Sequence, residues 1–301
     1  MDSPLRCSIG VIAYNEEHNI LRLLQALTTQ RLRQVEIAEV IVVSSACRDR
    51  TDEIVRQFIA ERGEDSIPKV TLLTQAKREG KASAINLFMK HATSDILIVE
   101  SGDTVPAPDA IEKLVLPFAD PKLGATGGRP VPVNKPDTLM GYAVQLLWRL
   151  HHRMALISPK LGEVIAFRKV MDSIPADSAV DEASIEAIMY RHQLRLRYIP
   201  DAIIHNKGPE NLRDFIKQRR RIQNGHLWLI RKHHYSVVSQ DSGVLLRILL
   251  SEIKENPRQI AKLIIVIKLE VLCRFLGYYD FYIKKKNPFA WDISQSTKKL
   301  D

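Results

Sequence analysis

Short apolar runs alternate with segments of helical periodicity through the first 120 residues of the chain. The runs are rich in valine and isoleucine and too short for helices, which is typical of strands buried on both faces; they lie at 6–13, 39–43, 69–74 and 95–100. Between them, hydrophobic residues recur with the spacing of one helix face, as in Ile20, Leu23, Leu24 and Leu27. Strands and helices that alternate in this way predict a mostly parallel α/β sheet with helices on both faces.

Four polar segments follow the predicted strands. They read AYNEE, SSACRDRT, QAKREGKAS and ESGDT, whereas the opposite ends of the strands carry ordinary residues. Ligands of open α/β sheets bind beyond the carboxyl ends of the strands. The sequence therefore predicts a site for a charged ligand along this edge.

The pattern is less regular from residue 121 to about 210. Residues 124–138 are rich in glycine and proline and predict a loop or an edge strand. The segments after them predict a helix, a short strand and one or two strands broken by Pro200, at 138–156, 163–169 and 194–205. From residue 211 the chain is mainly helical and basic, and Asn211 is expected to cap the first of these helices.

The C-terminal region contains a helix with one long apolar stripe. The stripe is followed by Lys284–Lys286 and consists of Ile260, Ile264, Ile267, Val271, Phe275, Tyr278 and Tyr282. It is expected either to pack on the domain or to lie in a membrane interface beside anionic lipid. Packing is favoured, because Lys268, Glu270 and Arg274 interrupt the apolar surface.

The net charge of the chain is +9, which indicates an acidic partner such as nucleic acid, an anionic membrane or a phosphorylated substrate. The three cysteines lie far apart, so neither a metal site nor a disulfide framework is expected. The sequence has neither a signal peptide nor a long uncharged apolar run. We therefore expect a cytoplasmic protein, either fully soluble or peripheral on the inner face of a membrane.

Several nucleotide and hydrolase motifs are absent from the sequence. No G-x-G-x-x-G follows the first strand, and Gln75 and Ala82 occupy positions where a P-loop needs glycine and a hydroxyl residue. No G-x-S-x-G, H-E-x-x-H or C-x-x-C occurs. These absences argue against a classical dinucleotide binder, a serine hydrolase and a zinc enzyme.

An ordered series of segments resembles the family-2 glycosyltransferases. The series covers residues 6 to about 235 and reads IAYNEEHNI, VVSSACRDRTDEIV, REGKASAIN, ESGDTVP, GEVIAFRK, VDEAS and QRRRI. The resemblance implies a GT-A fold, a nucleotide-diphosphate sugar as donor, a hydroxyl acceptor and Mg²⁺ or Mn²⁺ as cofactor. It implies a transferase domain over 1–235, with a nucleotide-binding half at 1–120 and an acceptor half at 121–235, and a helical extension over 236–301.

The resemblance also implies roles for individual residues at the donor site. Tyr14 and Glu16 would line the nucleotide, with Ser45 where the family commonly has an aspartate. Lys81 and Arg78 would reach the base or the diphosphate. Asp103 would bind the metal, and Ser101 replaces the first aspartate of the family's D-x-D. Serines thus replace acids of the family at positions 44, 45 and 101. The resemblance therefore does not imply a preference for uridine nucleotides.

The catalytic base of the family corresponds to Glu182, with Asp181 beside it. An inverting transfer needs a carboxylate within reach of the acceptor hydroxyl. The alternative is that both acids simply begin a helix, where negative charge is favourable. Gln218 and Arg221 match the family's Q-x-x-R-W motif, with Ile222 in place of tryptophan, which weakens any case for a polymerising enzyme.

Two other functions remain open at this stage. One is a non-catalytic protein of the same fold that binds nucleotide sugars or glycans, as the substituted acids suggest. The other is nucleic-acid binding by residues 217–234, which few aromatic residues support, and it is not expected. Arg219 is expected to face solvent, and a lone histidine such as His205 is more often structural than a metal ligand. The donor sugar, the acceptor and the oligomeric state do not follow from the sequence.

Overall fold

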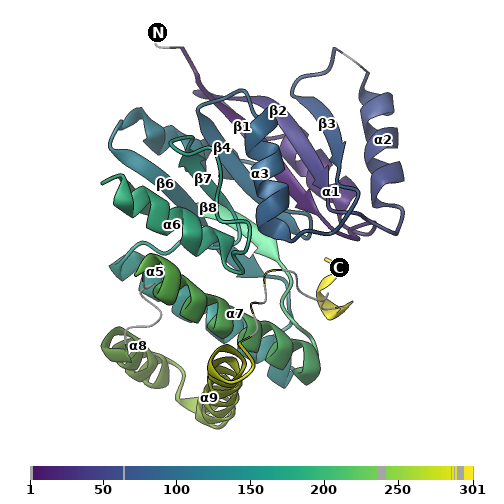
Figure 1. The fold of residues 1–301 in the computed structure, drawn as a ribbon. Helices are drawn as coiled ribbons and strands as arrows, with labels where there is room; N and C mark the ends of the chain where they lie inside the picture. The colour runs from purple at the N-terminus through teal and green to yellow at the C-terminus, as the bar shows by residue number, and fades with distance from the viewer. Residues whose placement is uncertain are drawn as a thin grey trace.

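The computed structural model describes residues 3–63, 65–235, 242–285, 287, 289 and 295–300. Eight strands form one sheet in the order β3-β2-β1-β4-β7-β6-β8-β5, with helices on both faces (Figure 1). The strands are β1 (Leu5–Ala13), β2 (Val35–Ser44), β3 (Lys69–Thr74), β4 (Ile96–Ser101), β5 (Thr104–Pro106), β6 (Leu123–Pro132), β7 (Ile165–Arg168) and β8 (Arg195–Asn206).

The helices follow the strands as the periodicity predicts. The α-helices are α1 (Ile20–Thr28), α2 (Thr51–Arg62), α3 (Lys81–His91), α4 (Ala110–Val115), α5 (Leu139–Ile157), α6 (Asp181–Arg191), α7 (Leu212–His233), α8 (Ser242–Glu255) and α9 (Ile260–Tyr282). Short 3₁₀ helices span Leu116–Ala119, Pro257–Gln259 and Gln295–Thr297. The predicted cap of α7 is present, because the side chain of Asn211 accepts a hydrogen bond from the amide of Asp214.

The sheet is parallel in its N-terminal half and mixed beyond it. Strand β1 runs parallel to β2 and β4, and β2 runs parallel to β3, so their carboxyl ends share one edge. Strand β7 is antiparallel to both of its neighbours, β4 and β6. The predicted mostly parallel α/β sheet is confirmed.

The prediction of a loop or an edge strand over 124–138 is correct for 133–138, which form a loop, and wrong for 124–132, which belong to β6. Strand β6 lies inside the sheet between β7 and β8. Its glycines allow close approach of neighbouring chain segments: a Cβ atom at Gly127 would lie 2.9 Å from a Leu161 side-chain atom, and one at Gly128 would lie 2.9 Å from the Ala202 carbonyl oxygen. Here glycine indicates tight packing and not a turn.

Pro200 does not divide the segment 194–205 into two strands. Strand β8 continues past it, and the proline lies where the pairing with β6 shifts: Gly127 pairs with Tyr198, whereas Arg129 pairs with Ile203. A proline has no amide hydrogen to donate, so it is tolerated at an irregularity in the ladder.

Two apolar cores cover the two faces of the sheet, and a third lies apart from it. Helices α1, α2 and α4 pack on one face, and α3 and α6 pack on the other. The third core joins α5, α7, α8 and α9, which gather beside the sheet (Figure 1). Helices α8 and α9 therefore share a core with α5 and α7.

The favoured packing of the apolar stripe on α9 is wrong. Its residues are largely exposed, and α9 instead packs through a face that includes Leu263, Val266, Cys273 and Gly277. A Cβ atom at Gly277 would lie 2.8 Å from the Gln223 side chain, so this glycine lets α9 approach α7 closely. Ion pairs between the two helices hold the same face inward.

No helix in the described part of the chain is long and apolar enough to cross a membrane. Cys7, Cys47 and Cys273 are free cysteines.

Candidate active site

One cavity of about 1030 Å³ lies between the carboxyl ends of β1 and β4 and helix α7. Every site residue expected from the sequence lines it: Tyr14, Glu16, Ser45, Arg78, Lys81, Ser101, Asp103, Asp181, Glu182, Gln218 and Arg221. His205 does not line it, whereas its neighbour Asn206 does. Residues that are far apart in sequence thus meet at the edge of the sheet where polar segments were expected.

The end of the cavity near β1 is suited to a flat, polar ligand. The guanidinium of Arg78 lies over the ring of Tyr14, 4.0 Å from its centroid. The hydroxyl oxygen of Ser45 is buried and has no hydrogen-bond partner among the described residues. A nucleoside offers both a ring that can stack and polar edge atoms that can bond to such a hydroxyl.

Glu16 connects this end of the cavity to the C-terminal segment, residues 295–300. Its carboxylate is almost fully buried and accepts hydrogen bonds from Asn19 and from the Lys298 ammonium. Burial, and secondly the nearby charge of Asp103, raise the pKa of Glu16 to about 8, although Lys298 acts in the opposite direction. The group is therefore finely balanced between its neutral and charged forms.

The C-terminal segment runs along the mouth of the cavity. The Leu300 amide donates to Asn19, the Arg22 side chain donates to the Leu300 carbonyl, and the Ser296 hydroxyl donates to Asp214 at 2.6 Å. Figure 1 shows this segment at the carboxyl edge of the sheet and away from α9. Nothing in the sequence pattern identifies these contacts, because they join residues that are 82 to 281 positions apart in the sequence.

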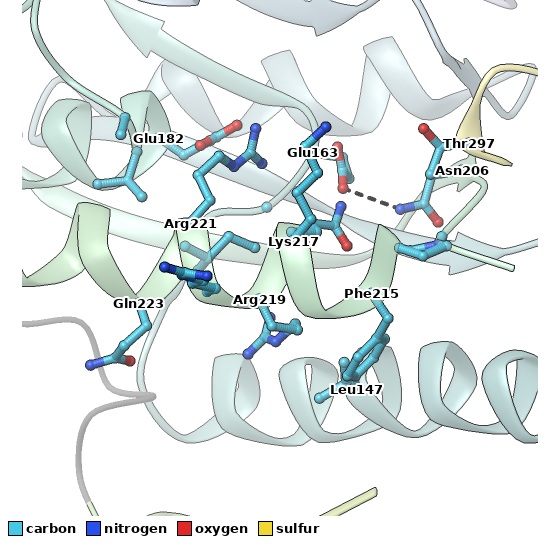
Figure 2. A pocket seen from close by; sticks show the side chains of 18 of the residues that line it. Leu147, Glu163, Glu182, Asn206, Phe215, Lys217, Arg219, Arg221, Gln223 and Thr297 are labelled. Atoms are coloured by element: carbon cyan, nitrogen blue, oxygen red, sulfur yellow. Dashed lines mark hydrogen bonds between the residues drawn. The ribbon is translucent and has the colours of Figure 1, made fainter. Parts of the chain in front are cut away.

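Asp103 lies among oxygen-bearing groups at the centre of the cavity. Burial, and then the charges of Asp103 and Glu182, raise the pKa of Glu163 to about 7. Asn206 donates to Glu163 at 3.2 Å, as Figure 2 shows, while its own Oδ1 atom is buried without a hydrogen-bond partner among the described residues. Asn206 pairs with Thr104, the residue after Asp103, and both Asn206 and Asp103 line the cavity.

These groups fit a hard divalent cation that keeps most of its other ligands from substrate or water. The carboxylate of Asp103 and the unpartnered amide oxygen of Asn206 are the oxygen donors that Mg²⁺ and Mn²⁺ prefer. The described residues contain no group of three or more His, Cys, Asp or Glu side chains arranged to hold a metal. The protein could therefore supply only part of the coordination shell.

Lys81 links the donor side of the cavity to the two acids at the start of α6. Its ammonium lies 2.9 Å from Asp181 and 3.0 Å from Glu182. Burial alone would lower the pKa of Lys81, but the two carboxylates raise it well above the ordinary value. Burial, and then the charge of Asp181, raise the pKa of Glu182, while Lys81 keeps that rise in check. The two acids thus do more than begin a helix.

Three consecutive arginines on α7 have different surroundings. Arg221 extends from α7 toward Glu182 (Figure 2), and burial lowers its pKa to about 10 although the carboxylates around it act against this. Arg219 forms a two-pronged ion pair with Glu270 of α9, with both bonds at 2.8 Å, and Arg220 pairs with Asp280. The expectation that Arg219 faces solvent is therefore wrong, because α9 covers it.

Sequence reasoning did not single out Glu163, Asn206, Lys160 or Lys298, although all four line the cavity. Glu163 lay within a segment quoted for the family resemblance, so a signal was present but carried no assigned role. Asn206 follows His205 on β8, and the alternation of a strand points the two side chains to opposite faces. Lys160 and Lys298 lie outside every quoted motif.

The model of the family Glycosyl transferase family 2 matches residues 8–187, which is more than half of the chain. The chain belongs to glycosyltransferase family 2. The matched part of this family-2 chain includes Asp103, Asp181 and Glu182 but ends before α7, which carries Arg221.

Curated relatives resemble this family-2 chain over most of its length. It is 26% identical over 240 residues to the probable glycosyltransferase YdaM of Bacillus subtilis, covering 75% of this chain and 56% of that protein. It is 27% identical over 231 residues to a poly-beta-1,6-N-acetyl-D-glucosamine synthase of Staphylococcus aureus, covering 72% of this chain and 54% of that one. The chain therefore spans about half the length of these curated relatives.

Among solved structures, the family-2 chain resembles the mannosyltransferase PcManGT of Pyrobaculum calidifontis in complex with GDP-Man and Mn²⁺. The match has a TM-score of 0.67 at 21% identity and covers 94% of this chain and 88% of that one. At this identity the likeness supports the GT-A fold and leaves the activity open.

Proposed function

We propose that this chain is a metal-dependent, inverting glycosyltransferase that moves a sugar from a nucleotide-diphosphate sugar to a hydroxyl acceptor. The observation that carries the proposal is the meeting of Asp103, Glu182 and Arg221 in one cavity. Together they offer a ligand for a metal, a base for the acceptor and a cation for the leaving group. The nucleotide-binding half spans 1–120 and the acceptor half 121–235, with 236–301 as a helical extension.

The donor would lie with its nucleoside against Tyr14, Arg78 and Ser45, and with its diphosphate toward Asp103. A divalent cation held by Asp103 and Asn206 would neutralise the phosphates when bound. Neighbouring solved structures that contain Mn²⁺ with nucleotide ligands, such as the GDP-Man complex, support this assignment by analogy. Lys81 adds a positive charge beside the same space.

The transfer then needs one proton to leave the acceptor and one bond to break at the donor. Glu182 takes the proton of the acceptor hydroxyl as its oxygen forms a bond to the anomeric carbon. The bond from that carbon to the phosphate oxygen breaks, and its electron pair leaves with the nucleoside diphosphate. Arg221 stabilises the growing negative charge of the leaving group, because a buried guanidinium offers a fixed fork of donors.

Lys81 contributes to this chemistry by holding Glu182 ready. A carboxylate that is protonated cannot accept a proton, and burial favours the protonated form. The ammonium 3.0 Å away stabilises the charged form and also fixes the side chain. The charges of the incoming substrate would then shift the balance between the protonated and the ionised form of Glu182 as the complex forms.

The first test is calorimetric binding of UDP and GDP with Mn²⁺, with Mg²⁺ or with EDTA. Wild type should bind a nucleoside diphosphate only with a divalent ion, and Asp103→Ala should lose at least tenfold in affinity, roughly the loss of one charged ligand. Asp109→Ala serves as a matched control, because Asp109 lies outside the cavity. If no nucleotide binds under any of these conditions, the proposal fails.

A second candidate is a protein of the same fold that binds nucleotide sugars without catalysis. The substituted acids at 44, 45 and 101 favour it, as does the ion pair that occupies both Asp181 and Glu182. The two functions differ in one measurement. An enzyme should hydrolyse or transfer its donor, and Glu182→Gln should abolish turnover while leaving nucleotide binding within about twofold. A binding protein should show no turnover in either form.

A further inference from the structure

The cavity continues beyond the carboxylates into a compartment with apolar walls. Its walls come from α5, α7, α8 and α9 and include Leu147, Leu150, Phe215, Leu245, Leu249 and Val266. Figure 2 shows Phe215 pointing from α7 toward Leu147, on the opposite side from Glu163 and Glu182. One end of the cavity is thus suited to a polar donor and the other to a group with little polarity.

The apolar compartment reaches the surface of the molecule at α9. Ile267 and Val271 line the cavity, and Val271 is also 61% exposed. A residue that is both exposed and part of the lining marks an opening. A long apolar group could therefore pass from the surface into the compartment at this position.

The surface around this opening is apolar, with a basic margin. Phe275 is 68% exposed, Leu246 of α8 is 59% exposed, and further exposed apolar residues on α9 are Ile264, Leu272, Tyr278, Tyr279 and Tyr282. Lys268, Lys284 and Lys285 lie on the same helix or directly after it and are exposed. Exposed apolar patches of this kind are uncommon on soluble proteins and mark sites of interaction.

The chemistry of the compartment favours a hydrocarbon chain over a peptide. A peptide that entered it would bring amide and carbonyl groups that need hydrogen-bond partners, which an apolar wall does not provide. A hydrocarbon chain has no such need and gains free energy from leaving water. The basic margin matches the negative charge of anionic lipid head groups.

The part of the cavity between its polar end and the apolar compartment is positively charged. Lys160 lines the cavity there, with Glu186 of α6 among the charged groups around it. Arg219 and Arg274 lie nearby and share Glu270. A polar head group between the compartment and the carboxylates would therefore meet cations on its way to Glu182.

We propose that the acceptor is the hydroxyl of a lipid, whose apolar chain lies between α5, α7, α8 and α9 and leaves past Val271 into an anionic bilayer. The exposed face of α8 and α9 rests on that bilayer. This inference depends on the proposed function, since it names the acceptor of the same site. It places the donor on the aqueous side and the acceptor on the lipid side of one cavity.

The first test measures flotation with vesicles of phosphatidylcholine alone or with about 30% phosphatidylglycerol, a strongly anionic composition. Wild type should float with the anionic vesicles, less so in high salt. The double variant Val271→Asp/Phe275→Asp should lose at least about tenfold in partitioning, because two charges enter the apolar face. Leu21→Asp is the matched control and should float like wild type, since Leu21 is 42% exposed but lies on α1.

The second test asks whether a hydrocarbon chain enters the compartment. Trp148 lines the cavity, so in a Trp228→Phe/Trp291→Phe background its fluorescence should be quenched saturably by a nitroxide-labelled stearic acid. Leu249→Glu should abolish the quenching, because it places a charge on the wall of the compartment. Leu246→Glu should not, because Leu246 lies three positions earlier on α8 and is not part of the lining.

Binding of UDP and GDP with Mn²⁺ is measured on every variant, which separates the two proposals. Flotation and saturable quenching together, with nucleotide binding intact, support a lipid acceptor. If nucleotide binds but neither vesicles nor the labelled chain do, the lipid acceptor is overturned and the transferase stands. Flotation without quenching also overturns it, since the chain would then lie outside the compartment. Absence of nucleotide binding overturns the transferase itself.

Discussion

Lys81, the first residue of α3, and Asp181, the first residue of α6, form an ion pair of 2.9 Å across the cavity. The pair joins the half of the chain that is suited to the nucleotide to the half that carries the candidate base. Because Lys81 also donates to Glu182 at 3.0 Å, the charge state of that base depends on a residue from the donor side.

We expect Lys81→Met to move the acidic limb of the pH–rate profile to higher pH. Burial raises the pKa of Glu182, and Lys81 opposes that rise, so its removal should raise the pKa further. On the acidic limb of the profile the rate should fall about tenfold for each unit by which the pKa rises, because the ionised fraction of the base falls by that factor. The measurement is the profile of kcat/KM from pH 5 to 9. Lys77→Met, an exposed lysine of the same segment, should leave the profile unchanged.

Arg221→Lys should lower kcat/KM by about 10- to 100-fold, although it keeps the positive charge. A lysine cannot reproduce the paired donors of a guanidinium, and the interaction matters most when the leaving group carries its full charge. Steady-state kinetics with the donor identified by calorimetry provide the measurement. An equal loss in Arg231→Lys, an exposed position on α7, would show that the effect is not specific to the cavity.

Gly102→Ala should weaken nucleotide binding about tenfold and cost about 1–3 kcal/mol of stability. A Cβ atom at this position would lie 2.7 Å from the Cγ atom of Glu16, which Asn19 and Lys298 hold in place. Thermal unfolding and calorimetry measure the two effects. In a Glu16→Ala background the same change should cost much less, and additive effects of the two substitutions would contradict the explanation.

Lys298→Ala should destabilise the protein, and the loss should grow as the pH rises above about 8. Burial raises the pKa of Glu16 to about 8, so below that value the group is mainly neutral and needs no cation. Above it, Glu16 of the wild type ionises beside Lys298, whereas the variant has a still higher Glu16 pKa and stays neutral, so the variant loses about 1.4 kcal/mol relative to wild type for each further pH unit. Denaturant unfolding at pH 6.5 and pH 9 measures the difference. Lys299→Ala, an exposed neighbour, should show no such trend.

His226→Gln should make the protein less sensitive to acid. Burial, and then nearby Lys160, Arg219 and Arg274, lower the pKa of His226 to about 3. The unfolded chain therefore binds a proton that the folded chain does not, and stability is lost as the pH falls from about 6.5 toward 3. At pH 5 this loss is about 2 kcal/mol. The gap in unfolding free energy between wild type and variant should change by that amount between pH 7.5 and pH 5.

The N-terminal half of the fold could be predicted because its signals are local. Apolar runs at 6–13 and 69–74 became strands β1 and β3 with almost the same bounds, since length and β-branched content decide their state. The position of β6 inside the sheet could not be predicted in this way. Its glycines indicate a loop by composition, and only the neighbouring chain reveals that they serve close packing.

The candidate site could be outlined from the order of the motifs, but several of its interactions could not. The sequence indicated that Asp103 and Glu182 belong to one site, because their motifs occur in a known order. The stripe on α9 was assigned to packing because Lys268, Glu270 and Arg274 interrupt the apolar surface of the helix. Instead, α9 packs through a face that contains Cys273 and Gly277. Small residues at these positions indicate close helix packing, but this signal did not enter the prediction.

The C-terminal segment has a consequence for the order in which the protein is built on the ribosome. Glu16 leaves the exit tunnel 282 residues before Lys298 does. Until then, the loop after β1 lacks the ammonium that its buried carboxylate contacts in the finished protein. The sheet, which ends at Asn206, can therefore form before Lys298 emerges, while the pocket at its edge takes its final form only after Lys298 has emerged.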